Sequence, residues 1–443
     1  MSASVRAARD PFVDLLRTGA ILVVVFGHWL MPVLARHGST VSAGNALATP
    51  GWWLLTWPAQ VMPVFFVAGG AANFHSYQGF LARGGTTQRW LAARVRRLVL
   101  PVFPLLAVWL AVPDLLLSLG VPAQPVGLAA AIVGQLLWFL AVYLIATALV
   151  PVMLAARNRW GDWVFVVLTG AAVGVDVLRL HGVPLVGYTN EVFVWLAVQQ
   201  LGIEYAAGRF SRLTRKGALA LGFAGLGGTA LLVLLAGYPD SMVGLPGQTV
   251  SNMSPATICL LTLGLGQFGF LLAARERLVV WSRRPGPAAV LRAVGSRCLT
   301  VYLWHMSALV LVAGVAVVGF GYATPQPGSP GWLVALPVSM LVMAVVLRVL
   351  VAVLGRFEAI RPAVVGAVPV WRMVVAVVVL VAGLTGIAAA GFVPAAGGWQ
   401  VGPIPWIVLI GLGFALTVPR LTRRAAGLGT RVLGALVTAL PRN

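Results

Sequence analysis

Long apolar runs alternate with short polar segments along almost the whole chain. The runs cover residues 12–34, 52–73, 98–119, 126–154, 163–180, 191–208, 217–237, 255–274, 290–319, 331–354, 371–393 and 401–418. A helix needs about 20 predominantly apolar residues to cross the hydrocarbon layer of a bilayer. The pattern therefore predicts an all-α, polytopic membrane bundle with about twelve transmembrane helices. The fifth and sixth runs are the weakest, because they contain Asp176, Arg179, Glu191 and Glu204.

Basic residues gather in every second polar segment. These segments hold Arg6 and Arg9; Arg83, Arg89, Arg94, Arg96 and Arg97; Arg157 and Arg159; Arg209, Arg212, Arg215 and Lys216; Arg275, Arg277, Arg283 and Arg284; Arg356 and Arg361; and Arg420, Arg423, Arg424, Arg431 and Arg442. The segments between them hold almost no cations beyond Arg36 and Arg179. Cytoplasmic loops of membrane proteins are enriched in Lys and Arg, so this alternation predicts that both termini are cytoplasmic. The expected location is the cell membrane.

Composition narrows the class of protein further. Hydrophobic residues make up 60% of the 443 residues and charged residues 9%, whereas soluble domains carry roughly 25% charged residues. The formal net charge is +21, but the cations lie between apolar runs, which points to the lipid bilayer as partner and not to nucleic acid. The two cysteines, Cys259 and Cys298, do not suggest a disulfide framework. The first apolar run does not resemble a cleavable signal peptide, since charged residues interrupt it.

The first apolar run carries the strongest group of chemically useful residues. Arg17 and His28 are eleven positions apart, which on a helix leaves only about 20° of rotation and about 16 Å of rise between them. Asp14 can pair with Arg17 at i,i+3 on the same face. Arg17 could simply anchor the helix at the cytoplasmic interface, and His28 could simply bond a neighbouring helix. An ionisable residue at membrane depth is nevertheless a candidate functional residue, and His suits proton transfer near neutral pH.

Other candidates lie later in the chain. Arg94 and Arg97, expected in a loop, could anchor the next helix or grip phosphates from the cytosolic side. Tyr302 and His305, in VYLWH, form an aromatic and polar cluster that could also be an interfacial belt with an interhelical hydrogen bond. Lesser candidates are Trp138 and Glu204, and Glu204 should face a partner or water because burying it is costly. No metal-ligand cluster, P-loop or nucleophile elbow is found, and we expect no metal.

The order and spacing of these motifs resemble the membrane acyltransferase-3 family. Arg17 and His28 are similar to the Arg-x10-His signature of its first helix, and Arg94 and Arg97 to its Arg-x-x-Arg element. Three further stretches also resemble family signatures: MPVFFVAGG at 62–70, LLWFL at 136–140 and VYLWH at 301–305. The sequence departs from the family at Ala68 and near Cys298, where Ser is usual. The resemblance predicts a core at residues 1–355, followed at 356–443 by two additional transmembrane helices and a basic cytoplasmic tail.

The resemblance implies a stand-alone O-acyltransferase. The donor would be acyl-CoA, with acetyl-CoA expected, and the acceptor a hydroxyl of a carbohydrate, glycan, lipid or secondary metabolite. His28 would be the general base, or would carry the acyl group covalently. Arg17, Arg94 and Arg97 would hold the CoA. The main alternative from another class is a proton-coupled multi-pass transporter or exporter, since buried His and Glu residues can relay protons. A structural subunit of an export assembly is a second alternative.

Overall fold

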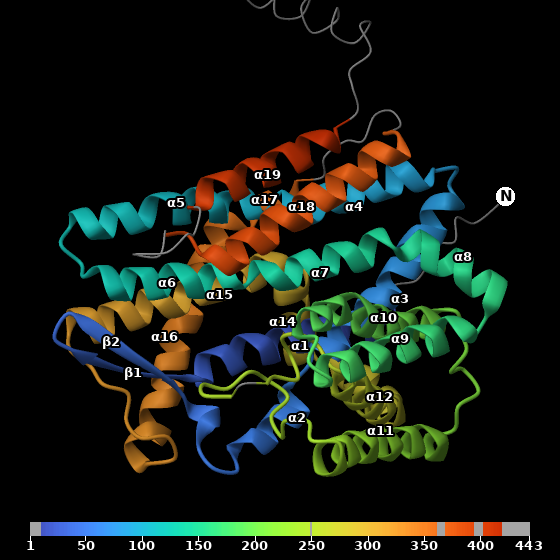
Figure 1. The fold of residues 1–443 in the computed structure, drawn as a ribbon, viewed down its shortest axis with the longest axis horizontal. Helices are drawn as coiled ribbons and strands as arrows, with labels where there is room; N and C mark the ends of the chain where they lie inside the picture. The colour runs from blue at the N-terminus through green and yellow to red at the C-terminus, as the bar shows by residue number, and fades with distance from the viewer. Residues whose placement is uncertain (1–9, 249, 361–367, 394–401, 419–443) are drawn as a thin grey trace, which may run out of the picture.

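The computed structural model describes residues 10–248, 250–360, 368–393 and 402–418. Arg6, Arg9, Arg361 and the predicted basic tail from Arg420 onward lie outside these residues. The fold is a bundle of helices (Figure 1), and its one sheet is a two-stranded hairpin within the described part of the chain. This arrangement confirms the predicted all-α, polytopic class.

Among the residues that the structure describes, nine helical segments are long and apolar enough to cross a membrane. They are α1 (Pro11–Leu30), η2–α3 (Trp52–Leu81), α4–α5 (Thr87–Ser118), α6–α7 (Ala123–Ala148), α9 (Trp163–Leu180), α11 (Arg215–Leu235), α15–η4 (Cys298–Gly319), α16 (Pro330–Leu354) and α18 (Val370–Ala390). A tenth forms if α12 (Ile258–Ala273) and α13 (Arg275–Ser282), which meet at 68°, make one broken span. The predicted sixth and twelfth runs form shorter helices, α10 (Asn190–Ala206) and α19 (Pro403–Leu416). The described residues therefore hold nine or ten full-length spans.

Shorter elements connect these spans. Within the composite segments, the helices are α2 (Thr56–Ala59), α3 (Met62–Leu81), α4 (Thr87–Val99), α5 (Val102–Ser118), α6 (Ala123–Gln135), α7 (Leu137–Ala148) and α15 (Cys298–Ala313). The connecting helices are α8 (Val150–Trp160), α14 (Pro285–Gly295) and α17 (Arg356–Ala359), with 3-10 turns at Ala46–Ala48 and Pro184–Thr189. Figure 1 shows α18 and α19 together along one side of the molecule and α11 and α12 along the opposite side.

A β-hairpin follows the first helix, where the hydropathy pattern predicts that the helix continues to residue 34. The helix ends at Leu30, with Met31 as its C-cap, because Pro32 has no backbone N–H to continue the helical hydrogen bonds. Strands β1 (Pro32–His37) and β2 (Thr40–Asn45) then pair antiparallel. The side-chain amide of Gln124 holds β2 to α6 by accepting from Val41 N and donating to Val41 O. This hairpin fixes the end of α1 that lies beyond His28.

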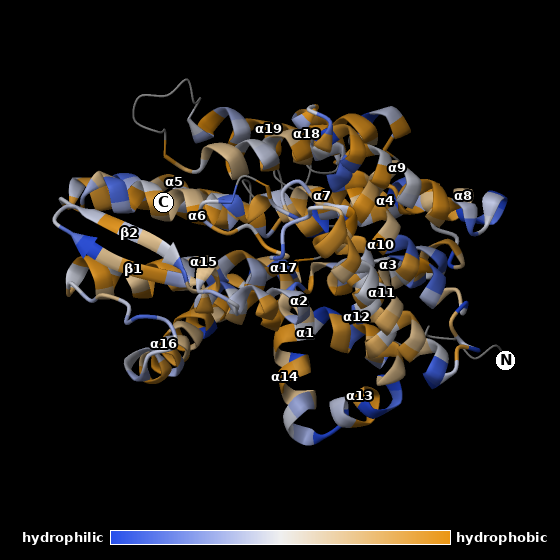
Figure 2. Cartoon of the chain, turned by 60° about the horizontal axis from the view of Figure 1, so that its bottom comes forward, coloured by the Kyte–Doolittle hydropathy of each residue, from blue (hydrophilic) through white to orange (hydrophobic). Residues whose placement is uncertain are grey.

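Helices α3 and α10 form the centre of the bundle. Most residues of α10 are buried, whereas the outer helices carry apolar side chains on their surface, as the orange colouring in Figure 2 shows. The two central helices approach closely because glycines face the partner backbone: a Cβ on Gly202 would lie 1.9 Å from Val67 O, and one on Gly70 2.2 Å from Gln199 O. Small residues permit such contacts between helices in membranes, where van der Waals packing drives association. Helix α10 is thus an internal element of the bundle.

Candidate active site

The centre of the candidate site is a pair of histidines from two spans. His28 of α1 and His305 of α15 approach with Nδ1 of the first 2.8 Å from Nε2 of the second. Their rings are nearly parallel, at 12°, with centroids 5.1 Å apart. His305 is fully buried, whereas His28 keeps part of its surface accessible. Two histidines that are 277 positions apart in the sequence therefore form one polar unit inside the bundle.

Hydrogen bonds beside this pair hold α15 in place. The indole of Trp29, next to His28, donates to the backbone carbonyl of His305 at 3.0 Å. The Tyr302 hydroxyl, one turn earlier on α15, donates to Leu136 O at 2.7 Å. Trp109 of α5 donates to Ser307 Oγ at 2.9 Å. These hydrogen bonds therefore connect α15 to α1, to α5 and to the junction of α6 and α7 around the two imidazoles.

The start of α15 is capped from a distant part of the chain. The Glu358 carboxylate of α17 accepts from Leu299 N, Thr300 N and the Thr300 hydroxyl, at 3.3, 2.9 and 2.6 Å. A carboxylate at a helix N-terminus satisfies free N–H groups and interacts favourably with the helix dipole. Glu358 therefore supports the helix that carries His305.

Arg17 lies on the same helix as His28, nearer the N-terminal end. Its guanidinium contacts the Asp14 carboxylate at 3.3 Å, which confirms the predicted i,i+3 pair. Within the described residues, Arg17 Nε is buried and has no hydrogen-bond partner. One donor of this cation therefore remains available to an anionic or carbonyl ligand.

Arg94 and Arg97 lie on a helix and not in a loop, which corrects the sequence-based expectation. The segment forms α4 because Thr86 caps its first turn, accepting from Arg89 N. Arg94 turns inward, where its Nε and Nη2 donate to Asn73 Oδ1 of α3 at 3.2 and 2.6 Å, while Arg97 is exposed. Arg94 lies within electrostatic range of Arg17 and Arg97. The three arginines therefore form one cationic region, and we name Arg17, Arg94 and Arg97 the arginine cluster.

Asn73 is a site residue that the sequence analysis missed. It is fully buried, and its Nδ2 has no hydrogen-bond partner among the described residues. A signal was present, since Asn73 is a lone amide in the apolar run FFVAGGAANF. The oxygen of Asn73 accepts hydrogen bonds from Arg94. Its nitrogen, like Arg17 Nε, is a buried donor without a partner among the described residues.

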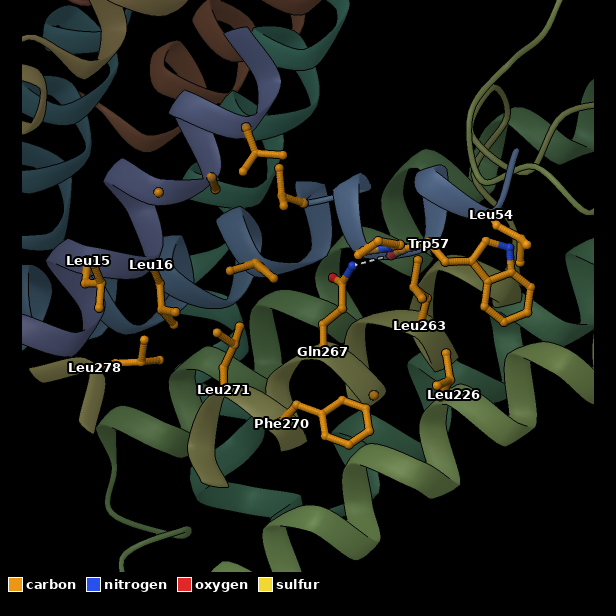
Figure 3. A pocket seen from close by; sticks show the side chains of 17 residues that line it. Leu15, Leu16, Leu54, Trp57, Leu226, Leu263, Gln267, Phe270, Leu271 and Leu278 are labelled. Atoms are coloured by element: carbon orange, nitrogen blue, oxygen red, sulfur yellow. Dashed lines mark hydrogen bonds between the residues drawn. The ribbon is translucent and has the colours of Figure 1, made fainter. Parts of the chain in front are cut away.

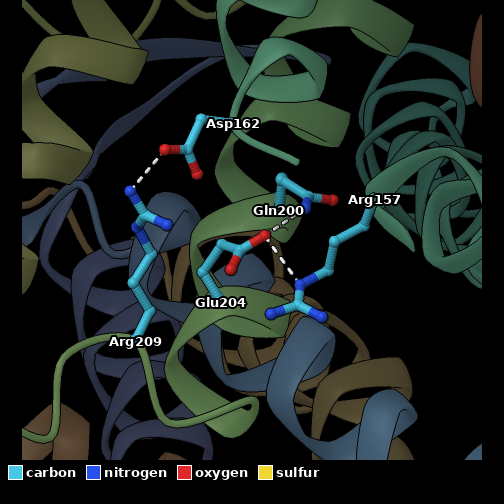
Figure 4. A network of polar contacts seen from close by, with 5 residues as sticks. All are labelled: Arg157, Asp162, Gln200, Glu204 and Arg209. Carbon is cyan, nitrogen blue, oxygen red and sulfur yellow. Dashed lines mark hydrogen bonds and ion pairs between the residues drawn. The ribbon is translucent and has the colours of Figure 1, made fainter. Parts of the chain in front are cut away.

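The remaining predicted residues lie around or away from the histidine pair. Trp138 packs edge-on against Phe139, and the ring of Phe139 contacts Tyr302 with centroids 5.1 Å apart. Glu204 faces a partner, as predicted: its Oε1 accepts from Arg157 at 2.9 Å and from Gln200 at 2.8 Å (Figure 4). No described contact connects Glu204 to His28 or His305. Its ion pair instead joins α8 to α10.

A large apolar cavity lies on the other side of α1 from the histidine pair. It has a volume of about 620 Å³, and α1 contributes Leu15, Gly19 and Val23, which recur on a stripe roughly opposite Arg17 and His28. Its lining is apolar apart from Gln267. The amide nitrogen of Gln267 donates to the carbonyl of Trp57 (Figure 3) and also to that of Gln60. Hydrocarbon would fit this cavity, but α1 separates it from the imidazoles.

The fold and site together define a multi-pass membrane protein that holds a buried histidine pair beside a cluster of cations. A family model described as an acyltransferase domain matches residues 10–354 of the 443. The chain therefore belongs to this family of membrane acyltransferases, which confirms the resemblance and favours an enzyme over a transporter. No curated protein and no solved structure matches the chain. The predicted division at residue 355 and the cytoplasmic termini stay predictions.

Proposed function

We propose that this acyltransferase takes its acyl group from acyl-CoA, with acetyl-CoA as the expected donor, in the cell membrane. The acceptor is a hydroxyl of a carbohydrate, glycan, lipid or secondary metabolite. One observation carries the proposal: within the described residues, His28 Nδ1 is bonded to His305 while His28 Nε2 has no hydrogen-bond partner. A histidine held at one nitrogen and open at the other is suited to act as a general base.

The arginine cluster supports CoA as the carrier of the acyl group. CoA is a polyanion, and Arg binds phosphates through several donors at once. Arg17 lies about 16 Å from His28 along the same face of α1. If the arginine cluster binds a phosphate group of CoA, the pantetheine arm therefore has to span this distance to bring the thioester to His28.

The chemistry of the proposed step balances without another reactant. His28 Nε2 takes the proton of the acceptor hydroxyl as the hydroxyl oxygen attacks the thioester carbonyl carbon. The new C–O bond forms, the C–S bond breaks, and the proton passes from His28 to the departing thiolate. General-base catalysis of this kind contributes about 10²–10⁴-fold in rate. In the covalent alternative, His28 Nε2 itself attacks the carbonyl, and an acyl-imidazole precedes transfer to the hydroxyl.

Radiolabelled acetyl-CoA tests the proposal. Membranes that contain the protein are incubated with the labelled donor, and label is followed into glycan, lipid and small-molecule fractions. We expect labelling with the wild type, a loss of about 10²–10⁴-fold with His28→Ala, and no loss with His75→Ala, which changes an exposed histidine. Full labelling by a normally expressed His28→Ala variant would overturn the proposed role. Trapping of labelled His28 after rapid quenching would select the covalent route.

A further inference from the structure

The hydrogen bonds of His305 determine which of its nitrogens carries a proton. His305 Nδ1 faces the backbone carbonyl of Tyr302 within hydrogen-bond distance. A carbonyl oxygen can only accept, so Nδ1 of His305 must be the N–H donor. In a neutral imidazole, the other nitrogen is then an acceptor. His305 therefore presents the lone pair of Nε2 to His28.

The same reasoning fixes the protonation of His28. Since His305 Nε2 accepts, His28 Nδ1 must donate across the 2.8 Å contact, which leaves the lone pair of neutral His28 on Nε2. The other assignment requires a cationic His305 that donates through both nitrogens. His305 is fully buried, and within the described chain no carboxylate bonds either histidine, so such a charge would be strongly disfavoured.

We infer that His305 is a positioning residue that holds His28 in the tautomer whose Nε2 can accept the hydroxyl proton. The inference rests on the proposed role of His28 as general base. A base oriented by a third group is the arrangement that activated nucleophiles commonly require. Here a neutral imidazole takes the orienting role, and its own orientation is set by the carbonyl of Tyr302.

His305 also stabilises the product of the proton transfer. When His28 becomes an imidazolium, its Nδ1–H still points at the lone pair of His305 Nε2, so the existing hydrogen bond becomes charge-assisted and stronger. No proton needs to leave the pair before the thiolate takes it from His28 Nε2. The bond from Trp29 to His305 O ties α15 to the residue that follows His28, which keeps the two rings in register.

Two substitutions at one position separate orientation from packing. His305→Leu fills space but offers no acceptor, whereas His305→Gln offers one donor for Tyr302 O and one acceptor for His28 Nδ1. We expect His305→Leu to lower kcat about 10–100-fold and to leave the KM for acetyl-CoA unchanged. Losses of this size follow when the hydrogen-bond partner that orients a metal-bound histidine is removed. His305→Gln should restore much of that loss. Ser307→Ala, which removes the bond from Trp109 to the same helix, is the matched control for weakened anchoring and should keep its kcat.

The ¹⁵N NMR spectrum of histidine-labelled protein supplies a readout that packing alone would not change. The chain has five histidines, and the His28→Ala spectrum identifies the signals of His28. We expect an Nδ1–H tautomer for His28 in the wild type and in His305→Gln, and its loss in His305→Leu. A wild-type His28 in the Nε2–H form would overturn the inference even if His305→Leu failed to fold. An unchanged kcat in His305→Leu, together with an inactive His28→Ala, would also overturn the inference. A fully active His28→Ala would instead refute the proposed role of His28 as general base.

Discussion

At the scale of single residues, Arg94 is the cation whose placement depends most on one neighbour. Two of its nitrogens donate to one oxygen of Asn73, and this amide supplies no charge. The positive charge of Arg94 therefore remains available to an anion. An asparagine in place of a carboxylate is the arrangement expected where an arginine must be held firmly and still bind phosphate.

Asn73→Asp should weaken acyl-CoA binding without disturbing the fold. The two side chains have nearly the same shape, but the carboxylate would neutralise Arg94 in place. We expect the KM for acetyl-CoA to rise about tenfold, which corresponds to about 1.4 kcal/mol, with kcat little changed. Asn158→Asp makes the same charge change at an exposed position on α8 and should leave KM as it is. An unchanged KM in Asn73→Asp would show that Arg94 does not meet the CoA.

How far the sequence predicts the site depends on how local each contact is. The pair of Asp14 and Arg17 follows from helical spacing, and the structure contains it. The contact between His28 and His305 joins positions 277 apart, and no spacing rule reaches across that distance. Asn73 illustrates a different limit. Its type and its apolar surroundings make it notable, but only the fold shows that Arg94 of another helix turns toward it.

At the scale of helices, the contact of α3 with α10 depends on the absence of side chains. Gly202→Ala would place a Cβ against the backbone of Val67, and backbone cannot move aside as a flexible side chain does. We expect the free energy of unfolding to fall by about 1–3 kcal/mol, the usual cost of overpacking. The midpoint of thermal unfolding in detergent measures this.

Gly174→Ala provides the matched control for that substitution. Gly174 also lies inside a helix, α9, and a Cβ there would meet nothing within 4 Å. Because Ala has the higher helix propensity, we expect the unfolding midpoint of Gly174→Ala to stay the same or rise. Equal losses of stability in the two variants would contradict the close contact of α3 and α10.

The cap on α15 gives a second prediction at this scale. Glu358→Ala would leave Leu299 N and Thr300 N without their carboxylate, and loss of an N-terminal cap costs about 0.5–2 kcal/mol. The cap lies at the first turn of α15, more than one turn before His305, so the variant should lose thermal stability by that amount while its kcat stays near the wild-type value. Glu276→Ala removes a carboxylate from an exposed position on α13 and serves as the control. Unchanged stability in Glu358→Ala would show that the cap contributes little.

Helices were more predictable from hydropathy than their ends or their partners. Each of the twelve apolar runs contains a helix in the described residues, because a run of that length has to satisfy its backbone internally. The runs did not reveal that Arg94 is helical, because α4 is too polar to count as an apolar run, although its buried Ala92, Val95 and Val99 recur at helical spacing. They also missed the β-hairpin, whose strands are stabilised by pairing with each other and by Gln124. The hydropathy of either strand does not predict these contacts.

At the scale of the whole molecule, the arrangement of charge predicts which face meets the cytosol. The segments that hold the basic residues should share one side of the membrane, and the hairpin of β1 and β2, which follows the first span, should lie on the other. The proposed use of cytosolic acyl-CoA requires this orientation, because the arginine cluster lies near the N-terminal half of α1. An inverted protein would present Arg17 and Arg97 to the wrong compartment.

Single cysteines introduced on the two sides test this orientation. Cys259 and Cys298 are first replaced by Ala, and Ser39→Cys in the hairpin turn or Ser211→Cys between α10 and α11 is then added; both positions are exposed. A thiol reagent that cannot cross the membrane should label Ser39→Cys in intact cells and Ser211→Cys only after the membrane is opened. The two sites are separated by five of the predicted spans, an odd number, so the labelling also tests the count between them. Labelling of both from outside would mean an even number of crossings between the two positions, and α10 would then be an internal helix that does not cross the bilayer.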